Sequence, residues 1–156
     1  MVLKNIPLSF VLILLFVSAC DSTKKTENNY VQYVNPLIGT DFTGNTYPGA
    51  QVPFGMVQLS PDNGLPGWDR IAGYFYPDST IAGFSHTHLS GTGAGDLYDV
   101  SFMPVTLPYR EAPQPLGIYS SFSHDDESVS AGYYQVLLKD YGIHVELTAT
   151  ERCGIQ

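Results

Sequence analysis

The residue types best suited to binding or chemistry gather near the middle of the chain. This stretch holds Trp68, the only tryptophan, together with His86, His88, Asp96, Asp99 and several glycines. Glycines allow a backbone to approach a ligand closely, and an indole ring offers a flat face on which the apolar face of a sugar can stack. We therefore predict a ligand-binding surface here. The alternative for Trp68 is a side chain that anchors its loop to the core.

The two histidines are two positions apart. In a strand this spacing places the His86 and His88 rings on the same face. Zinc would need a third and usually a fourth ligand, and His124 and His144 have no recognisable metal-ligand spacing to this pair. We assign no metal site, and interpret the pair as hydrogen-bonding groups that either line a polar binding site or are satisfied within the core.

Two carboxylates follow the histidines. Asp96 and Asp99 are close in sequence, and glycoside hydrolysis uses a pair of carboxylates. Acids in glycine-rich loops also form turns and caps, which is the alternative. We take both as candidate substrate-binding residues and assign no catalytic residue. Ser90 lacks the Gly-x-Ser-x-Gly pattern of a hydrolase nucleophile, because His88 occupies the position of the first glycine.

The composition favours strands over helices. Tyrosine (11), phenylalanine (8), glycine (15) and proline (11) are frequent, and 14% of the 156 residues are charged. Residues 132–138 and 142–150 alternate in polarity and predict an antiparallel pair. We expect 73–76 and 81–86 to form a hairpin. The other predicted strands are 30–34, 100–107 and 56–59, the last ending in a turn at 60–64. Short strands separated by turns indicate an all-β fold, an antiparallel β-sandwich.

The N-terminal segment has the features of a lipoprotein signal peptide over residues 1–19. Lys4 gives a positive start, an apolar run too short to span a bilayer comfortably follows, and the segment ends in VSAC at positions 17–20. This ending resembles a lipobox, so we predict lipidation of Cys20, membrane contact through that anchor only, and a place in the bacterial cell envelope. An ordinary cleaved secretory signal is the alternative. Residues 20–29 have the composition of a polar tether.

The remaining 30–156 form the predicted domain. The formal net charge of −8 and the absence of a basic patch argue against nucleic acid as a partner. Cys153 has no disulfide partner once Cys20 is lipidated, and we interpret it as a small buried apolar side chain. Residues 146–152 have the pattern of a strand still in progress. We therefore interpret the chain as a fragment whose domain is cut short.

Five segments of the chain carry a resemblance to a known family. They are VNPLIGT (34–40), GNTYPGAQVPFGMVQLSPD (44–62), GW (67–68), GYFYPDSTIAGFSHTHLSGTGAGDLYD (73–99) and GYYQVLLKDYGIHVELTATERCG (132–154). In these motifs and their order the chain resembles glycoside hydrolase family 92, the exo-acting α-mannosidases. One departure is Asn45, where many members have a histidine, and this puts the linkage preference in doubt.

The resemblance implies the fold and chemistry of a two-domain enzyme. An N-terminal β-sandwich precedes an (α/α)6 catalytic domain, activity depends on calcium, and hydrolysis inverts the anomeric configuration. The catalytic acid and base and the calcium ligands belong to the downstream domain, so none is assigned here. Trp68 matches the tryptophan that lines the leaving-sugar subsite. The loops 39–49 and 86–99 are expected to face the same cleft or the seam between the domains.

The resulting hypothesis is the N-terminal part of a secreted, lipid-anchored α-mannosidase. It would hydrolyse terminal α-mannosides, α-1,2-linked in N-glycans, and be inactive without its own C-terminal catalytic domain. Mannose-containing glycans would be its ligands. The alternative is a non-catalytic carbohydrate-binding domain that uses Trp68 and the tyrosines.

Overall fold

The computed structural model describes residues 29–91, 93–113 and 116–156. Its strands pair in antiparallel fashion, and the helices of this described part are short 3₁₀ helices. This confirms the all-β fold predicted from the sequence. None of these helices is long and apolar enough to cross a membrane. The predicted signal peptide, Cys20 and the tether as far as residue 28 lie outside the described residues.

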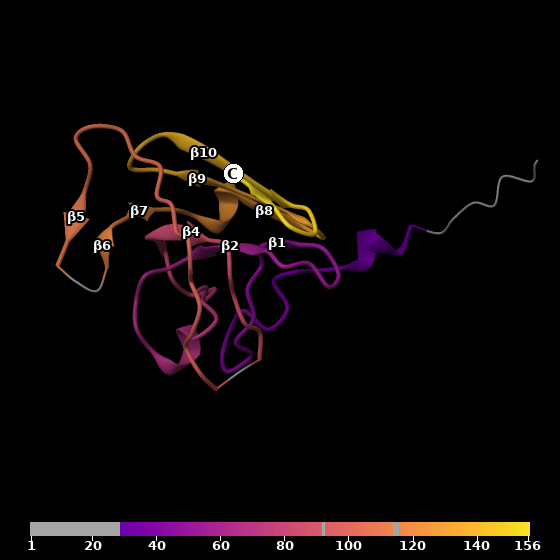
Figure 1. The fold of residues 1–156 in the computed structure, drawn as a ribbon. Coiled ribbons are helices and arrows are strands. Elements are labelled where there is room, and N and C mark those ends of the chain that lie inside the picture. The colour runs from indigo at the N-terminus through magenta and orange to yellow at the C-terminus, as the bar shows by residue number, and fades with distance from the viewer. Residues whose placement is uncertain (1–28, 92, 114–115) are drawn as a thin grey trace, which may run out of the picture.

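Two sheets make up most of the fold (Figure 1). The larger sheet has the order β11 (Gly154–Ile155), β10 (Ile143–Ala149), β9 (Tyr133–Leu138) and β8 (Glu127–Ser130). The smaller sheet has the order β1 (Ala50–Gln51), β2 (Gln58–Asp62) and β4 (Gly83–Ser85). Two short pairs join β3 (Thr80–Ile81) to β7 (Ser120–Ser121) and β5 (Glu111–Ala112) to β6 (Gly117–Ile118). The 3₁₀ helices are η1 (Tyr30–Tyr33), η2 (Trp68–Arg70) and η3 (His124–Asp126).

The β9–β10 hairpin follows directly from the alternation in its sequence. Tyr134, Val136 and Leu138 are buried while the residues between them are half-buried, as expected for a strand with one face on the core. Val136 pairs with Val145 of β10. Gly142, at φ +64°, lies in the connecting turn, where a left-handed backbone favours glycine. The predicted antiparallel pair is confirmed.

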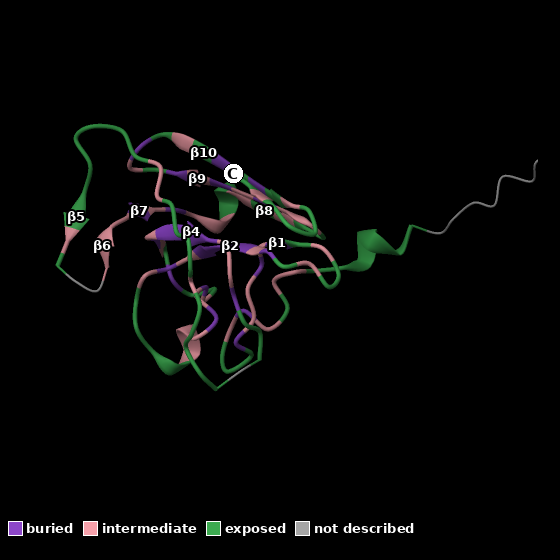
Figure 2. Cartoon of the chain, viewed as in Figure 1, coloured by how far each residue is buried: buried purple, intermediate pink, exposed green. Residues whose placement is uncertain are grey.

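The core lies between the two sheets. Leu59 of β2, Phe84 of β4, Val136 of β9 and Leu147 of β10 are almost completely buried and belong to one apolar cluster. A methyl group added at Gly154 would lie 3.1 Å from the Leu59 Cδ2 atom, so Leu59 reaches as far as β11 in the larger sheet. Figure 2 shows the buried segments facing one another across this layer. The arrangement is the predicted sandwich.

A buried carboxylate joins the larger sheet to the segment beyond β2. Glu127 accepts hydrogen bonds from the hydroxyls of Tyr74 (2.9 Å) and Tyr134 (2.7 Å), and lies 2.6 Å from His124 Nδ1. The other ring nitrogen of His124 lies 2.7 Å from the carbonyl oxygen of Tyr76. Both His124 nitrogens therefore face acceptors, which fixes the ring between Glu127 and the Tyr76 carbonyl.

The strand predicted at 30–34 is wrong, because this segment forms η1. The Asn29 side chain caps the helix by accepting the Val31 N–H at 3.2 Å. Tyr30 and Tyr33 are 69% and 78% exposed. Because these side chains are exposed, a strand here would bury neither of its faces. The cap at Asn29 therefore decides the local conformation.

The hairpin predicted from 73–76 and 81–86 is also wrong. Residues 73–76 form no strand, because the backbone there bonds to Asn63: Asn63 N–H donates to Gly73 O (2.8 Å) and Phe75 N–H to Asn63 Oδ1 (2.5 Å). The second segment divides instead between two sheets. Its start lies in β3 and pairs with β7, while β4 pairs with β2.

Three smaller predictions need correction. Strand β2 begins at Gln58 and continues through Pro61, where a turn was expected. Strand β1 pairs only with Gln58 and Leu59, so Pro61 has a neighbouring strand on one side only. The missing N–H of Pro61 is tolerated there for that reason. In 100–107 a single bridge joins Phe102 to Phe84. Cys153 is exposed, not buried.

Candidate functional site

Long loops cover the outer side of the smaller sheet, at the bottom of Figure 1. The loop 63–79 carries η2, and the loop 86–101 follows β4. The loop 39–49 joins them, since the Gly91 N–H donates to the Asn45 carbonyl at 2.6 Å. Asn45 itself has φ +50° and is 8% exposed, and its Oδ1 atom has no hydrogen-bond partner in the described part of the chain. The structure thus brings together the two loops that the sequence predicted to face the same cleft or the seam between the domains.

His88 holds the base of these loops through contacts at both ring nitrogens. Its side chain is fully buried, with Nδ1 2.7 Å from the Gln58 carbonyl oxygen and Nε2 2.9 Å from Asp62 Oδ1. A carbonyl and a carboxylate only accept hydrogen bonds, so both ring nitrogens of His88 face acceptors. These contacts fix the orientation of the His88 ring beside Asp62.

This pair is not part of a nucleophilic triad. Ser85 Oγ also lies near His88, at 3.2 Å, but it approaches Nε2, the nitrogen that already faces Asp62. A serine nucleophile needs the nitrogen opposite to the one that the carboxylate orients. Ser85 is in addition completely buried. His88 therefore organises the site and satisfies buried groups.

His86 lies in different surroundings. Strand β4 ends at Ser85, before either histidine, so the same-face geometry expected for a strand does not apply. The Nδ1 atom of His86 lies 2.8 Å from the Val100 carbonyl oxygen, and the His86 ring contacts Phe102 edge to face. With Met103, Pro104, Gly154 and Gln156, His86 and Phe102 line a cavity of about 450 Å³. The structure does not bring the two histidines into one site.

Asp96 and Asp99 are exposed and bond within their own loop. Asp96 Oδ1 accepts the Leu97 N–H at 2.8 Å, and Asp99 Oδ2 accepts the Thr87 hydroxyl at 3.3 Å. Both carboxylates accept a hydrogen bond from their own loop, as turn-forming acids do, and both side chains are exposed. The backbone around them is unusual, because Leu97, Tyr98 and Val100 all have positive φ (80°, 61° and 54°). Such strained residues cluster at functional sites.

Trp68 begins η2 and is 63% exposed. Its indole lies beside the glycine-rich loop: a methyl group added at Gly93 would be 3.4 Å from Trp68 Cη2. Glycine at this position keeps the loop backbone close to the ring without blocking it. The large exposed fraction leaves the indole accessible for stacking.

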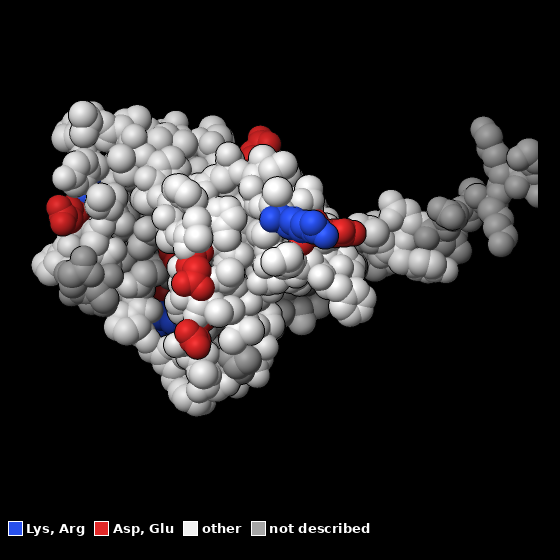
Figure 3. All heavy atoms as spheres, in the orientation of Figure 1, with Lys and Arg blue, Asp and Glu red and all other residues white. Residues whose placement is uncertain are grey.

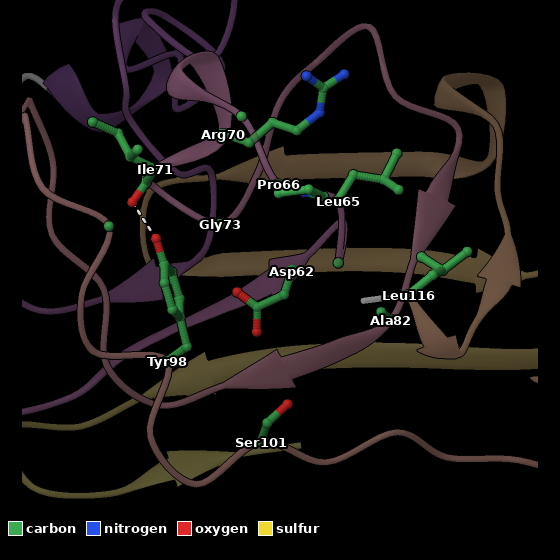
Figure 4. Close-up of a pocket in the computed structure, with 13 residues that line it drawn as sticks. Asp62, Leu65, Pro66, Arg70, Ile71, Gly73, Ala82, Tyr98, Ser101 and Leu116 are labelled. Atoms are coloured by element: carbon green, nitrogen blue, oxygen red, sulfur yellow. Dashed lines mark hydrogen bonds between the residues drawn. The ribbon is translucent and has the colours of Figure 1, made fainter. Parts of the chain in front are cut away.

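A cavity of about 510 Å³ lies between η2 and the strained loop (Figure 4). Its polar groups come from Asp62, Arg70, Tyr98 and Ser101. The Tyr98 hydroxyl donates to the Ile71 carbonyl and so ties the two loops together. Burial, and then the charges of Asp62 and Asp96, raise the pKa of Tyr98 above its ordinary value. The apolar wall of the cavity is made of Leu65, Pro66, Ile71, Ala82 and Leu116.

Arg70 at the cavity edge is held in place by two bonds. Its Nε and Nη2 atoms donate to Asp78 at 2.6 and 2.5 Å, and its guanidinium lies 4.6 Å from the centre of the Phe75 ring. Hydrogen bonding to Asp78 raises the pKa of Arg70 further. Bidentate pairs of this kind fix both partners.

A calcium site does not fit the described residues. They contain no group of three or more His, Cys, Asp or Glu side chains that could hold a metal ion, whereas Ca²⁺ takes about six to eight oxygen ligands. Asp96 and Asp99, the closest candidates in sequence, are engaged with their own loop. No step of a reaction can be assigned to calcium on these residues.

Sequence reasoning missed Asp62, Arg70, Tyr98 and Ser101. Asp62 follows a proline in a segment expected to be a turn, so it looked like a turn former. Its pairing with His88 joins residues 26 positions apart. A useful signal would have been that a histidine as deeply buried as His88 needs a charged or polar partner.

Comparisons with known proteins agree with the family indicated by the motifs. A model of the glycosyl hydrolase family 92 N-terminal domain matches residues 33–156. A family GH92 α-mannosidase from Bacteroides thetaiotaomicron, solved with mannoimidazole, is 46% identical with a TM-score of 0.75, and the match covers 81% of this chain and 17% of that one. A family GH92 inverting mannosidase from the same organism is 32% identical with a TM-score of 0.62, covering 80% and 17%.

A relative known from sequence is similar over the same region. An uncharacterized secreted glycosidase of Arthroderma benhamiae is 30% identical over 139 residues, which are 83% of this chain and 17% of that protein. The chain thus spans less than a fifth of the length of the relatives it matches. On the family match, which extends over most of its length, the chain belongs to glycosyl hydrolase family 92, of which it carries the N-terminal domain.

Proposed function

We propose that this chain is the N-terminal part of a secreted α-mannosidase and that Trp68 forms a wall of its leaving-sugar subsite. The observation that carries the proposal is the exposed indole beside the glycine-rich loop, in a domain similar to that of a mannosidase solved with mannoimidazole. An indole held at its edge by Gly93 presents a flat face to a sugar ring. The substrate is a terminal α-mannoside, α-1,2-linked in N-glycans.

The chemistry itself belongs to a second domain in this proposal. Inversion needs an acid and a base on opposite sides of the sugar with room for a water molecule between them. Asp96 and Asp99 bond to their own loop and are proposed to contact the glycan. The acid, the base and the calcium ligands lie in the C-terminal catalytic domain, so the chain alone is inactive.

The anchor completes the proposal. Lipidation at Cys20 would hold the enzyme in the bacterial cell envelope, with the tether 20–29 between lipid and domain. Replacing Cys20 by alanine should abolish incorporation of a labelled fatty acid and release the protein from membranes. Unchanged membrane retention of that variant would contradict the anchor and favour another mode of localisation.

The function is tested by Trp68→Ala in the full-length protein. Loss of stacking should lower kcat/KM for an α-1,2-mannobioside about 10-fold, from about 1.4 kcal/mol of lost contact with the leaving sugar. The matched control is Tyr33→Ala, which removes another exposed aromatic ring from η1, away from the cavity and its loops. Equal activity of both variants would contradict the subsite.

The alternative, a carbohydrate-binding domain, makes a different prediction for the chain by itself. A binding module folds alone and retains mannosides, with quenching of the single tryptophan's fluorescence. The mannosidase proposal expects neither tight binding nor turnover by the isolated chain. Titration of the chain with mannobiose, followed by tryptophan fluorescence, separates the two.

A further inference from the structure

The cavity between η2 and the loop 95–101 has no role in the function proposed above. Trp68 is not among its lining residues, although Gly67 and Arg70 on either side are. Gly95 lines the cavity, whereas Gly93 meets the indole. The cavity and the indole therefore lie on neighbouring parts of one glycine-rich loop, as two separate places for a ligand.

The charged side chains of the cavity already have partners. Asp62 is paired with His88, and Arg70 with Asp78 through two bonds. An anion would find no unpaired cation among these residues, and a cation would have to displace a buried histidine from Asp62. Burying an extra charge without a partner is costly. The cavity is thus suited to a neutral ligand.

The lining combines an apolar wall with hydrogen-bonding groups. Figure 4 shows the Asp62 carboxylate between Tyr98 and Ser101, with Leu65 and Pro66 on the other side. His88 bonds to Asp62 Oδ1, and the structure gives Oδ2 no bond to a described residue. A purely apolar ligand would leave Oδ2 and the Ser101 hydroxyl without partners. A ligand with hydroxyls on one face and C–H groups on the other matches both sides.

The size agrees with this chemistry. A volume of about 510 Å³ falls within the ordinary range for small-molecule sites. Gly73 explains how the floor is built: at φ +88°, a methyl group there would come within 2.5 Å of Asp62 Oδ1. Glycine at 73 lets Asp62 and His88 lie directly against the loop backbone.

From these observations we propose that the cavity binds a further sugar residue of the glycan, beyond the residue that stacks on Trp68. Asp62 Oδ2 accepts a sugar hydroxyl, Ser101 bonds to a second one, and Leu65, Pro66 and Leu116 cover the apolar face. This rests on the proposed function, because it extends the same glycan past the leaving-sugar subsite.

Calorimetry on the full-length protein tests the proposal with two probes that it cannot hydrolyse, the sulfur-linked analogues of α-1,2-mannobiose and α-1,2-mannotriose. The trisaccharide should bind more tightly than the disaccharide. Ser101→Phe, which fills the cavity from an exposed position, should reduce this advantage at least about 10-fold, and Ser101→Ala about 3- to 10-fold through one lost hydrogen bond. Ser128→Phe, an exposed position on β8, is the matched control and should keep the advantage.

Two results would overturn the cavity site: equal affinity for both probes in the unaltered protein, or an advantage that survives Ser101→Phe. Turnover of ordinary, oxygen-linked α-1,2-mannobiose is measured in parallel. Its absence would count against the mannosidase, while the binding data still decide the cavity. Thermal melting of each variant shows that the fold is intact.

Discussion

At the scale of single residues, several weakly exposed carboxylates each face a partner. His88 lies against Asp62, Arg70 forms two bonds to Asp78, and the His124 ring lies against Glu127. A buried charge that loses its partner costs more than the pair contributes. The Asp62–His88 pair could not be read from the sequence, because spacing reports only local neighbours and the two residues are 26 positions apart. The chemistry of His88 was predictable as hydrogen bonding; its partner was not.

Alkaline pH should destabilise the domain through the tyrosines around Glu127. Burial, and then the charge of Glu127, raises the pKa of both Tyr74 and Tyr134 above the ordinary value. The folded state therefore keeps protons that the unfolded chain releases above about pH 10. Their contribution to stability is complete below that pH and is lost as pH rises, by about 1.4 kcal/mol per pH unit for each group.

Denaturant unfolding between pH 8 and 11 checks this expectation. Tyr134→Phe should make the decline of the unfolding free energy above pH 10 shallower, because one proton fewer is retained. The same variant is less stable near pH 8, since Glu127 loses one hydrogen bond. A decline as steep as that of the unaltered protein would be the contrary result.

At the scale of elements, the sequence predicted those strands whose side chains alternate against the core. Strands β9 and β10 have that alternation, and the burial of Tyr134, Val136 and Leu138 follows it. The predictions failed where one side chain supplies the hydrogen bonds that a neighbouring strand would otherwise give to the backbone. Asn29 caps η1, and Asn63 supplies the bonds that a partner strand would give to 73–75. Strand propensity does not report a side chain that competes with strand pairing for the backbone hydrogen bonds.

Two glycines with the same backbone strain separate conformation from contact. Gly73 and Gly142 have φ of +88° and +64°, but a methyl group at Gly142 would meet nothing within 4 Å, while one at Gly73 would press on Asp62 and His88. Gly142→Ala should cost about 1–2 kcal/mol, from the left-handed conformation alone. Gly73→Ala should cost about 1–3 kcal/mol more, from overpacking.

Chemical unfolding of the two variants at neutral pH measures the difference. In Gly73→Ala the Trp68 fluorescence should also change, because the loop that carries η2 must move. Equal losses of stability would mean that Asp62 and His88 can move away from the added methyl group at no cost in free energy. This would contradict the close packing at Gly73.

At the scale of the whole molecule, one layer of apolar side chains joins the two sheets, and this much was predictable from composition and alternation. The placement of the loops was not, because it depends on bonds between distant segments such as Tyr98 to Ile71 and Gly91 to Asn45. The chain has a formal net charge of −8, and Figure 3 shows separated acidic groups and few lysines or arginines on the visible face.

Removal of one side chain from this layer should weaken the whole sandwich. Leu59→Ala leaves a cavity between β2 and β11 and should cost about 2–5 kcal/mol. Ile155→Ala, at a 54% exposed position on β11, is the control and should cost less than 1 kcal/mol. Denaturation followed by far-ultraviolet circular dichroism gives both values. A small loss for Leu59→Ala would show that the two sheets are held together elsewhere.

Asn63 has a consequence for how this domain can diversify. Through its backbone and side chain it bonds to Gly73, Phe75 and Thr80, so both ends of the loop 63–80 are fastened at one fully buried residue. The tip around Trp68 takes no part in that fastening. Insertions or substitutions at the tip can therefore be accepted while the sandwich stays unchanged, so the tip can vary between related enzymes independently of the fold.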